Sequence, residues 1–350
     1  MATNVNEAKR QDFYQRIAAK GLTPLWLNMS AMVSREPGSR CKPAIWHFEE
    51  IRASIMEGGT LITAQEAERR VLMLENPGLD QAHRITNSLY AGIQLVMPGE
   101  TAPNHRHVAN ALRFIIEGTG AYTGVNGERT TLHPGDFVVT PGWTWHEHGN
   151  NSADPVIWMD GLDVHLVNLL DASFMEGEGP EDVEVVEDLS YVSHGHNMLP
   201  VDYKRGTEGK SPIFNYPYSV TRDVLEKMSR SVAPDACHGF KMRFIDPTTG
   251  DWAMPTIAVY MQLLPKGFVS QPYRSTDGTI FAVVEGTGHS VIAGQRFDWR
   301  EKDIFVVPSW HSVQHFPDNE AVLFSYSDRA TQEKLGFWRE QRGNRSGGDK

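Results

Sequence analysis

The 350-residue sequence contains the same pattern of short segments twice, at one constant offset of 168 positions. Glu-Gly-Thr-Gly at 117–120 recurs at 285–288, and Phe-Val-Val at 137–139 recurs at 305–307. Several matches at a single offset indicate a duplicated structural unit. Any fold for this chain must therefore hold two copies of one domain.

Each copy is predicted to consist of short β-strands. In the first copy, the apolar segment 91–97 ends at Pro98-Gly99 and the segment 111–117 ends at Gly118. Asn126-Gly127 is a strong signal for a two-residue hairpin turn. Frequent short strands with regular turns are typical of a β-sandwich or a small β-barrel.

Helices are expected outside the two β domains. A helix is predicted over 5–20, as a local lid or a subunit contact, and another around 220–231. Thr63 and Glu66 form a capping-box pattern, so a helix that carries Arg69 and Arg70 should start there. The predicted parts are a helical or irregular N-terminal arm (1–83), a first β domain (84–170), a linker with a helix (171–249), a second β domain (250–335) and a flexible tail (336–350).

Composition excludes several classes of function. The formal net charge is −11, which disfavours nucleic acid and anionic membranes as partners. No apolar run is long enough to span a bilayer, and the N-terminus has no signal-like apolar core. The two cysteines, Cys41 and Cys237, are expected to be free thiols in a reducing compartment. We therefore expect a cytoplasmic protein, with the linker acids at 176–188 in solvent.

Three histidines of the first copy form a candidate metal site. His105 and His107 are one residue apart, so they point to the same face of a strand. His146, on a later strand of the same domain, can complete a triangle with them. Three neutral imidazoles on one side of a metal leave its other positions open for substrate and O2.

The second copy lacks these ligands. The positions of His105 and His107 hold Tyr273 and Ser275, and after a one-residue deletion the position of His146 holds Val313. The second copy is thus expected to be a structural or interface domain. The nearby His311 and His315 are interpreted as polar side chains in the mouth of the barrel.

The histidines lie within segments that resemble the two cupin motifs. Gly99, His105-x-His107 and Gly118 resemble the first motif, and Gly135, Pro141-x-Trp143-x-x-His146 and Asn150 resemble the second. The usual glutamate ligand is missing, because Ala111 and Leu112 occupy its positions. The resemblance implies an all-β bicupin, with two jelly-roll β-barrels and additional N-terminal and linker helices.

The segments 102–107, 111–118 and 140–149 further resemble the gentisate 1,2-dioxygenase family, which includes salicylate and 1-hydroxy-2-naphthoate dioxygenases. The resemblance implies one Fe(II) per subunit in the N-terminal cupin, a metal-free C-terminal cupin and a homotetramer. It implies cleavage of a small aromatic 2-hydroxy acid by O2. We expect conversion of gentisate to maleylpyruvate, with salicylate or 1-hydroxy-2-naphthoate as the alternative substrate.

Charged and polar residues around the histidines are candidates for binding the substrate. Strand parity turns Arg113 into the barrel, where its partner is a substrate carboxylate or, alternatively, a protein carboxylate. His148 shares the parity of His146, so it could hydrogen-bond a ring hydroxyl or oxygen and move a proton, with Asp160 to orient it. By resemblance, the substrate pocket contains Arg69, Gln94, Arg113, His148 and Asp160, with Tyr90 and Gly92 on its wall.

Other functions remain as alternatives. One is a different metal-dependent cupin enzyme, such as a sugar isomerase or a thiol dioxygenase. The missing glutamate disfavours the isomerase and the two-domain length disfavours the thiol enzyme. A second is a non-catalytic bicupin for storage, metal binding or ligand sensing.

Three further residues are given no role in the site. His194 and His196 have a spacing that metal ligands can have, but no third ligand is near them in the sequence. Arg106, between His105 and His107, is expected to point out of the barrel.

Overall fold

The computed structural model describes residues 2–80, 83–177, 179, 185–204 and 211–343. The chain divides into two units, Met1–Gly38 and Ser39–Lys350. The first unit contains α1 (Ala2–Ala18), which confirms the predicted N-terminal helix, and α2 (Leu25–Met32). Within this unit the indole of Trp26 donates a hydrogen bond to the Tyr14 hydroxyl.

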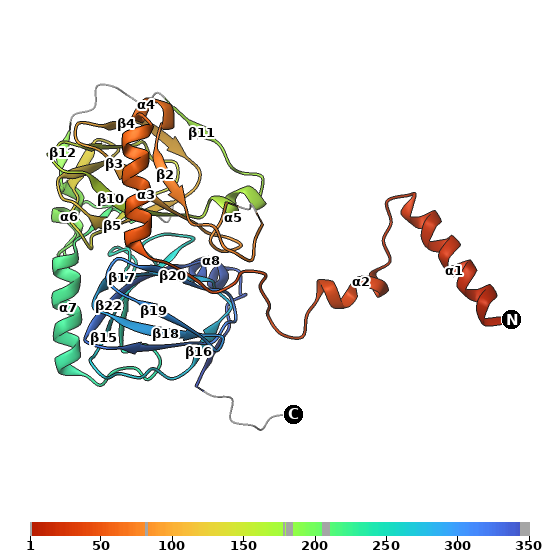
Figure 1. Ribbon diagram of the computed structural model, residues 1–350. Helices are drawn as coiled ribbons and strands as arrows, with labels where there is room; N and C mark the ends of the chain where they lie inside the picture. The colour runs from red at the N-terminus through yellow and green to blue at the C-terminus, as the bar shows by residue number, and fades with distance from the viewer. Residues whose placement is uncertain (1, 81–82, 178, 180–184, 205–210, 344–350) are drawn as a thin grey trace. The chain divides into compact units, whose positions relative to one another are not determined.

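The second unit consists of two halves, each made of two facing sheets (Figure 1). The first half has β2 (Arg70–Met73), β3 (Tyr90–Val96), β4 (Thr101–His107), β5 (Ala111–Glu117), β6 (Ala121–Val125), β7 (Glu128–Thr131), β8 (Phe137–Thr140), β9 (His146–Asn150) and β10 (Val156–Leu162). The second half has β14 (Phe240–Arg243), β15 (Ala258–Leu264), β16 (Tyr273–Ser275), β17 (Thr279–Glu285), β18 (Gly288–Ile292), β19 (Gln295–Trp299), β20 (Ile304–Val307), β21 (Val313–Pro317) and β22 (Ala321–Ser327).

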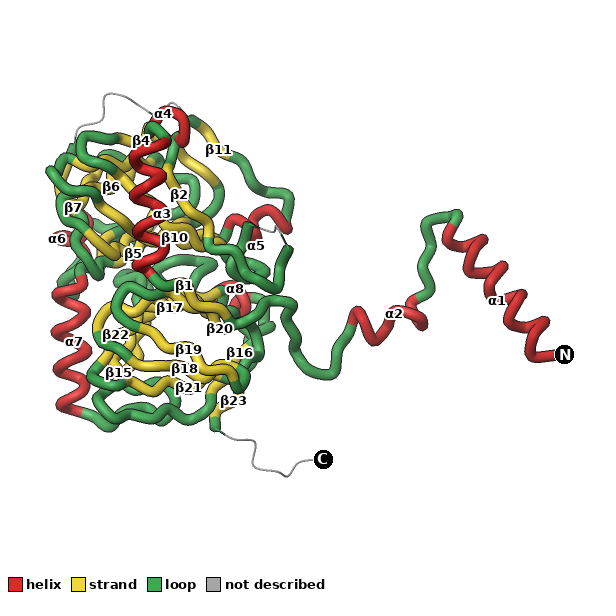
Figure 2. Tube along the Cα trace, viewed as in Figure 1, coloured by secondary structure: helices red, strands yellow, loops and turns green. Residues whose placement is uncertain are grey.

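The duplication is visible in the order of the strands. One sheet of the first half runs β8-β5-β10-β3-β2, and the corresponding sheet of the second half runs β20-β17-β22-β15-β14. The remaining strands form β4-β9-β6-β7 in one half and β19-β18-β21-β16 in the other. Strands make up most of both halves, and helices lie at the periphery (Figure 2). The all-β, duplicated fold predicted from the sequence is confirmed.

Short additional strands extend these sheets. They are β1 (Ala44–Trp46), β11 (Met175–Glu176), β12 (Val186–Glu187), β13 (Asn215–Tyr216) and β23 (Glu340–Arg342). β13 completes the large sheet of the first half by pairing with β8, and β1 completes that of the second half by pairing with β20. Both edge strands come from chain segments outside the repeat.

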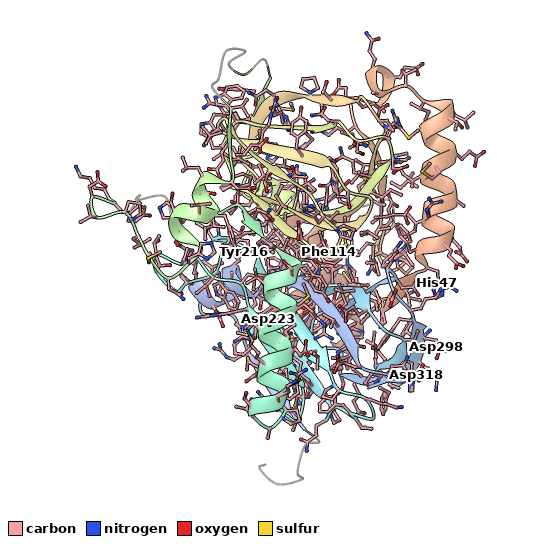
Figure 3. All side chains as sticks on the ribbon, turned by 90° about the vertical axis from the view of Figure 1, so that its left-hand side faces the viewer. His47, Phe114, Tyr216, Asp223, Asp298 and Asp318 are labelled. Atoms are coloured by element: carbon pink, nitrogen blue, oxygen red, sulfur yellow. The ribbon has the colours of Figure 1, made fainter. Side chains whose placement is uncertain are left out.

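The two halves share one continuous hydrophobic core. Phe114 of the first half stacks on Phe324 of the second, with ring centroids 4.3 Å apart. Phe114 lies between the two sets of strands in Figure 3. The Tyr326 hydroxyl donates to the backbone carbonyl of Tyr90 across the same boundary. Burial of large side chains from both halves therefore stabilises them jointly.

Helices cover the outside of the sheets. α3 (Phe48–Leu61) packs on β2 and β3 through its buried face, and α7 (Tyr218–Ser231), which confirms the helix predicted near 220–231, packs on β14 and β15. Shorter helices are α4 (Ala64–Ala67), α5 (Val164–Leu169), α6 (Leu189–His194) and α8 (Arg329–Lys334). No helix in the described ranges is both long and apolar enough to cross a bilayer.

The prediction that a helix carries Arg69 and Arg70 is wrong. The capping box of Thr63 and Glu66 is present, but α4 ends at Ala67 because Glu68 has a positive φ of 52°, which is outside the range of an α-helix. Arg70 instead begins β2, where its buried side chain pairs with Glu100. A capping box specifies where a helix starts but not how long it runs.

Several expected boundaries also differ. The N-terminal arm at 1–83 includes the strands β1 and β2, and the expected tail at 336–350 includes β23, which pairs with β16. β14 precedes the expected start of the second β domain at 250. Of the linker acids, Glu176 pairs with Arg106, whereas Glu178, Glu181, Asp182 and Glu184 lie outside the described residues. Cys41 and Cys237 are both buried free thiols.

Candidate active site

Three histidines come together on neighbouring strands of the first half. His105 on β4 lies directly across from His146 on β9, and His107 follows two residues along β4 on the same face. Their candidate ligand nitrogens all lie within 4.8 Å of one another. Among the described residues this is the one group of three or more His, Cys, Asp or Glu side chains placed to hold a metal ion.

Each of the three rings is oriented by a backbone carbonyl. The Nδ1 atoms of His105, His107 and His146 lie 3.0, 2.7 and 2.9 Å from the carbonyl oxygens of Pro103, Ala109 and Thr144. Donation from Nδ1 to a carbonyl leaves the lone pair on Nε2, which is how metal-ligating histidines are commonly oriented. The Nε2 atom of His146 is buried and has no hydrogen-bond partner within the described ranges.

The histidines are held in their neutral form. Burial lowers the pKa of His105 to about 3, helped by the nearby charge of Arg69, and lowers the pKa of His107 to about 4. The pKa of His146 is also lowered, again mainly by burial. Neutral imidazoles at neutral pH are ready to ligate, so the donor set fits a transition metal such as iron, copper, nickel or zinc.

Arg113 lies on the opposite sheet and faces this site from β5. Its side chain is buried, and one terminal nitrogen donates to the Thr140 hydroxyl at 2.5 Å. Its Nε lies 3.4 Å from a carboxylate oxygen of Asp160 and makes no hydrogen bond with the described residues. Arg113 therefore has a protein carboxylate, that of Asp160, as a partner, and its Nε is still available to donate a hydrogen bond to a substrate carboxylate.

Asp160 lies at the centre of the same sheet. Strand pairing places it beside Gly92 of β3 and Arg113 of β5, and its carboxylate accepts a hydrogen bond from the Trp158 indole at 3.0 Å. Burial raises the pKa of Asp160 to about 6, against the opposing charge of Arg113. Burial likewise lowers the pKa of Arg113 to about 10, so both groups are mainly charged at pH 7.

The remaining pocket candidates on this sheet share one face of β3. Tyr90, Gly92 and Gln94 alternate along the strand, opposite Leu162, Asp160 and Trp158 of β10. A Cβ atom on Gly92 would come within 2.4 Å of the Tyr90 hydroxyl and 2.6 Å of the Val71 side chain. Glycine is therefore required there for the observed position of the Tyr90 ring.

His148 lies beside the histidine group, on β9. Its Nδ1 lies 3.0 Å from the Thr123 hydroxyl, and its Nε2 is buried without a partner in the described part of the chain. Burial holds the pKa of His148 well below its usual value. Thr123, rather than Asp160, orients this ring, which corrects the prediction from the sequence. The reason is cross-strand register: β6 pairs Thr123 with His148, while Asp160 lies on the other sheet.

Arg69 reaches the metal-site histidines from the segment between α4 and β2. One guanidinium nitrogen lies 2.6 Å from Nε2 of His105. The same Nε2 cannot both accept this hydrogen bond and ligate a metal, so metal loading requires the guanidinium to move away from it. With Arg113 and Asp160, Arg69 leaves this part of the site with one net positive charge, despite the acidic chain as a whole.

Known proteins of similar sequence and structure share this arrangement of the chain. Residues 92–165 match the family described as Cupin domain. A gentisate 1,2 dioxygenase 1 of Aquipseudomonas alcaligenes is 54% identical over 95% of this chain and 96% of its own. The chain belongs to the gentisate 1,2-dioxygenase family.

Other members of this family carry other substrate names. A 5-aminosalicylate 1,2-dioxygenase of Comamonas sp is 34% identical over 94% of this chain and 89% of its own. The crystal structure of salicylate 1,2-dioxygenase from Pseudoaminobacter salicylatoxidans, described as adducts with gentisate, superposes with a TM-score of 0.91. It is 30% identical and covers 97% of this chain and 94% of that one. The fold and the dioxygenase family are therefore shared across most of the chain.

The weaker sequence candidates lie outside this family site. Arg106 points away from the histidines, lies between the rings of Trp143 and Trp145, and pairs with Glu176. His194 and His196 belong to no group of three possible ligands in the described ranges. In the second half, Tyr273 on β16 pairs with Val313 on β21, as His105 pairs with His146 in the first half, and Ser275 follows two residues along β16.

Sequence reasoning missed the residues that hold the site side chains in place. Thr123, Thr140 and Trp158 contact His148, Arg113 and Asp160, respectively. Each lies on an adjacent strand or two residues along the same strand. Thr123 and Trp158 share the inward parity of their strands, a signal that could have marked them as interior, but pairing them with a partner requires the strand register.

Proposed function

We propose that this chain is an Fe(II)-dependent gentisate 1,2-dioxygenase, which converts gentisate and O2 to maleylpyruvate. The observation that carries the proposal is the set of three neutral histidines whose possible ligand atoms lie within 4.8 Å of one another, facing the buried Arg113, whose Nε has no hydrogen-bond partner among the described residues. A metal on one sheet and a cation on the other suit a substrate that chelates through one end and carries a carboxylate.

Iron fits this donor set better than zinc for the proposed reaction. Zinc has no redox chemistry, whereas a three-histidine site with open positions suits Fe(II). Bound iron would orient the aromatic acid and O2 and pass electron density between them. His105, His107 and His146 would hold one iron per subunit through Nε2.

The chain's own residues would bind and orient the substrate. The Arg113 guanidinium would bind its carboxylate, with Arg69 as a second cation and Gln94 as a neutral hydrogen-bonding group. The free Nε2 of His148 would hold or move a proton at a ring hydroxyl, while Thr123 keeps the ring in place. Tyr90 and Gly92 would form the wall, and Asp160 would orient Arg113.

The reaction balances without any further reductant. The ring bond between the carboxyl-bearing carbon and the adjacent hydroxyl-bearing carbon breaks, and both oxygen atoms of O2 enter the product. Gentisate is the least demanding substrate because its 5-hydroxyl donates electrons to the ring. Salicylate and 1-hydroxy-2-naphthoate, which lack that group, are the alternative substrates.

Oxygen uptake with a panel of hydroxybenzoates tests the proposal. Iron-loaded protein is expected to consume O2 with gentisate, more slowly with salicylate or 1-hydroxy-2-naphthoate, and not with 4-hydroxybenzoate, whose hydroxyl is not adjacent to the carboxylate. An oxygen electrode and product absorbance measure the rate, and zinc-loaded protein is the matched control. If the protein retained iron but turned over no 2-hydroxy acid, the proposed dioxygenase activity would be refuted and a non-catalytic bicupin would be favoured.

The raised pKa of Asp160 leads us to expect that substrate affinity depends on pH. Its pKa is raised to about 6, so it becomes protonated as the pH falls through 6 and then competes less for Arg113. The KM for gentisate, which stays an anion in this range, is therefore expected to fall several-fold from pH 7.5 to 5.5.

The raised pKa of Asp160 also affects the stability of the fold. Because Asp160 loses its proton less readily in the folded than in the unfolded protein, its ionisation lowers stability as the pH rises from about 4 to 6.

Asp160→Asn is the matched control for this pH dependence. The variant should have a low KM that no longer changes between pH 7.5 and 5.5, measured by initial rates of O2 uptake. An unchanged pH dependence in Asp160→Asn would show that another group controls it.

We also propose that the protein is cytoplasmic and forms a homotetramer, with the first half catalytic and the second half free of metal. Support comes from the family resemblance and from the two buried free thiols, which suit a reducing compartment. Light scattering of purified protein measures the assembly, and a monomer at working concentration would contradict this part.

A further inference from the structure

The interior of the second half contains polar side chains at positions that differ from those of the first half. At the positions equivalent to Arg113 and Asp160 it has Phe281 and Ser325, which are paired strand to strand in the same way. A cation is nevertheless present on another strand. Lys241 of β14 occupies the place that Val71 has in the first half, since each lies across from a glutamine of the next strand.

Lys241 is a half-buried cation that lies over two aromatic rings. Its ammonium lies 4.3 Å from the ring centroid of Tyr260 and 5.9 Å from that of Phe281. It makes no hydrogen bond or ion pair of ordinary length with any described residue. Burial lowers its pKa to about 8, although the charge of Asp277 opposes this shift, so the group is still mainly charged at pH 7.

Gln262, across from Lys241 on β15, also has an unused polar atom. Its side chain is 1% exposed, and its amide nitrogen donates to the carbonyl of His238 at 3.1 Å. Its Oε1 is buried and has no donor within the described ranges. Buried polar atoms are normally paired, so Oε1 of Gln262 is placed to accept a hydrogen bond from a ligand or a water, beside the cation of Lys241 on the neighbouring strand.

Both residues line a hollow in the second half. Lys241, Tyr260 and Tyr273 border an outer chamber of about 290 Å³, close to the lower end of the roughly 300–1,000 Å³ typical of small-molecule sites. Gln262, Phe281 and His315 border an inner chamber of about 20 Å³, enough for a group the size of one water. Lys241 and Tyr273 line both chambers.

Several other charged groups that border the hollow have partners among the described residues. Arg342 pairs with Asp235, Arg329 pairs with Glu333, and Asp277 accepts a hydrogen bond from the Trp338 indole. Burial lowers the pKa of His238 to about 2 and that of His315 to about 3, so neither histidine is a cation at neutral pH. Arg243 donates to the carbonyl of Gly250, and Arg274 donates to the side chain of Gln341. Lys241 borders both chambers, so we assign it as the cation for a ligand, and the nearby carboxylates disfavour a second negative charge.

We propose that this hollow in the second half binds a small monocarboxylic acid with an aromatic body and a hydroxyl group. The carboxylate would pair with the Lys241 ammonium, the body would lie against Tyr260 and Phe281, and the hydroxyl would donate to Oε1 of Gln262. The site is separate from the histidine group, and it does not depend on the proposed enzymatic activity.

Titration calorimetry tests this site with benzoate, 3-hydroxybenzoate and 4-hydroxybenzoate as probes. The Arg113→Met background removes the proposed carboxylate partner of the first half. In that background at least one hydroxybenzoate is expected to bind, and Lys241→Met is expected to weaken it at least tenfold. The matched control is Lys266→Met, which changes an exposed lysine of the same half and should leave binding unchanged.

A second variant keeps the test independent of Lys241. Gln262→Leu should remove the preference for a hydroxybenzoate over benzoate while leaving benzoate binding intact. Crystals soaked in 3-iodo-4-hydroxybenzoate should show anomalous density for iodine between Tyr260 and Phe281. Absence of binding by all three probes, or binding that Lys241→Met does not change, would overturn the proposal.

Discussion

His105→Ala is expected to yield a folded protein that no longer binds its metal. Among the residues that the structure describes, His105 is one of three side chains grouped to hold a metal, and the chain has alanine and leucine where other cupins place a fourth ligand. Loss of a group that merely orients a ligand costs roughly 10- to 100-fold in metal affinity, so loss of a ligand should cost at least ~100-fold. Metal analysis after dialysis measures occupancy, and gentisate-dependent O2 uptake should fall with it.

His133→Ala is the matched control. His133 belongs to the same half, its side chain is 59% exposed, and it lies outside the group of three ligands. This variant should keep its metal and its activity. Full metal occupancy in His105→Ala would contradict the assignment of the site.

Arg113→Met is expected to weaken substrate binding strongly while metal occupancy stays unchanged. Truncating one partner of a buried charge pair costs about 2–5 kcal/mol, which corresponds to roughly 30-fold to several thousandfold in affinity. The loss should appear in kcat/KM for gentisate. Methionine roughly preserves the volume of the aliphatic stem, so the sheet should still form.

Two further variants separate binding from structure. Arg70→Met removes another buried arginine of the same half, one that pairs with Glu100, so it should lower the melting temperature without raising KM. In Arg113→Met with Asp160→Asn, the orphaned carboxylate is neutral, so stability should recover while substrate binding does not. Recovery of both would mean that Arg113 serves only the ion pair with Asp160.

The grouping of the three histidines could be predicted from the sequence because strand parity is a local property. His105 and His107 had to share a face, and the duplicated copy without histidines marked their positions as special. Arg113 and His148 were predicted to face inward by the same reasoning. In each case a period of two along one strand was enough.

The contacts between strands could not be predicted in this way. Thr123 orients His148 because β6 and β9 pair in one particular register, and Asp160 lies beside Arg113 because β10 and β5 do. Register depends on turns and on packing across the whole sheet. The position of Arg69 was harder still to predict, since the positive φ of Glu68 ends the helix that was expected to hold it.

The edge strand β1 has a consequence for the order in which the molecule can be completed. It precedes the whole first half in the chain, yet its partner β20 belongs to the second half and is synthesised near the end. The start of α3 is tied to the same place, because His47 and the backbone of Phe48 both contact Asp303.

During synthesis, the segment 44–48 therefore leaves the ribosome long before its partner strand β20 has been made, and it stays unpaired until then. A second half made alone would expose the edge of β20 to other chains. Duplication produced two similar halves, but β1 comes from the chain before the first half, so a second half made alone would lack the edge strand of its large sheet.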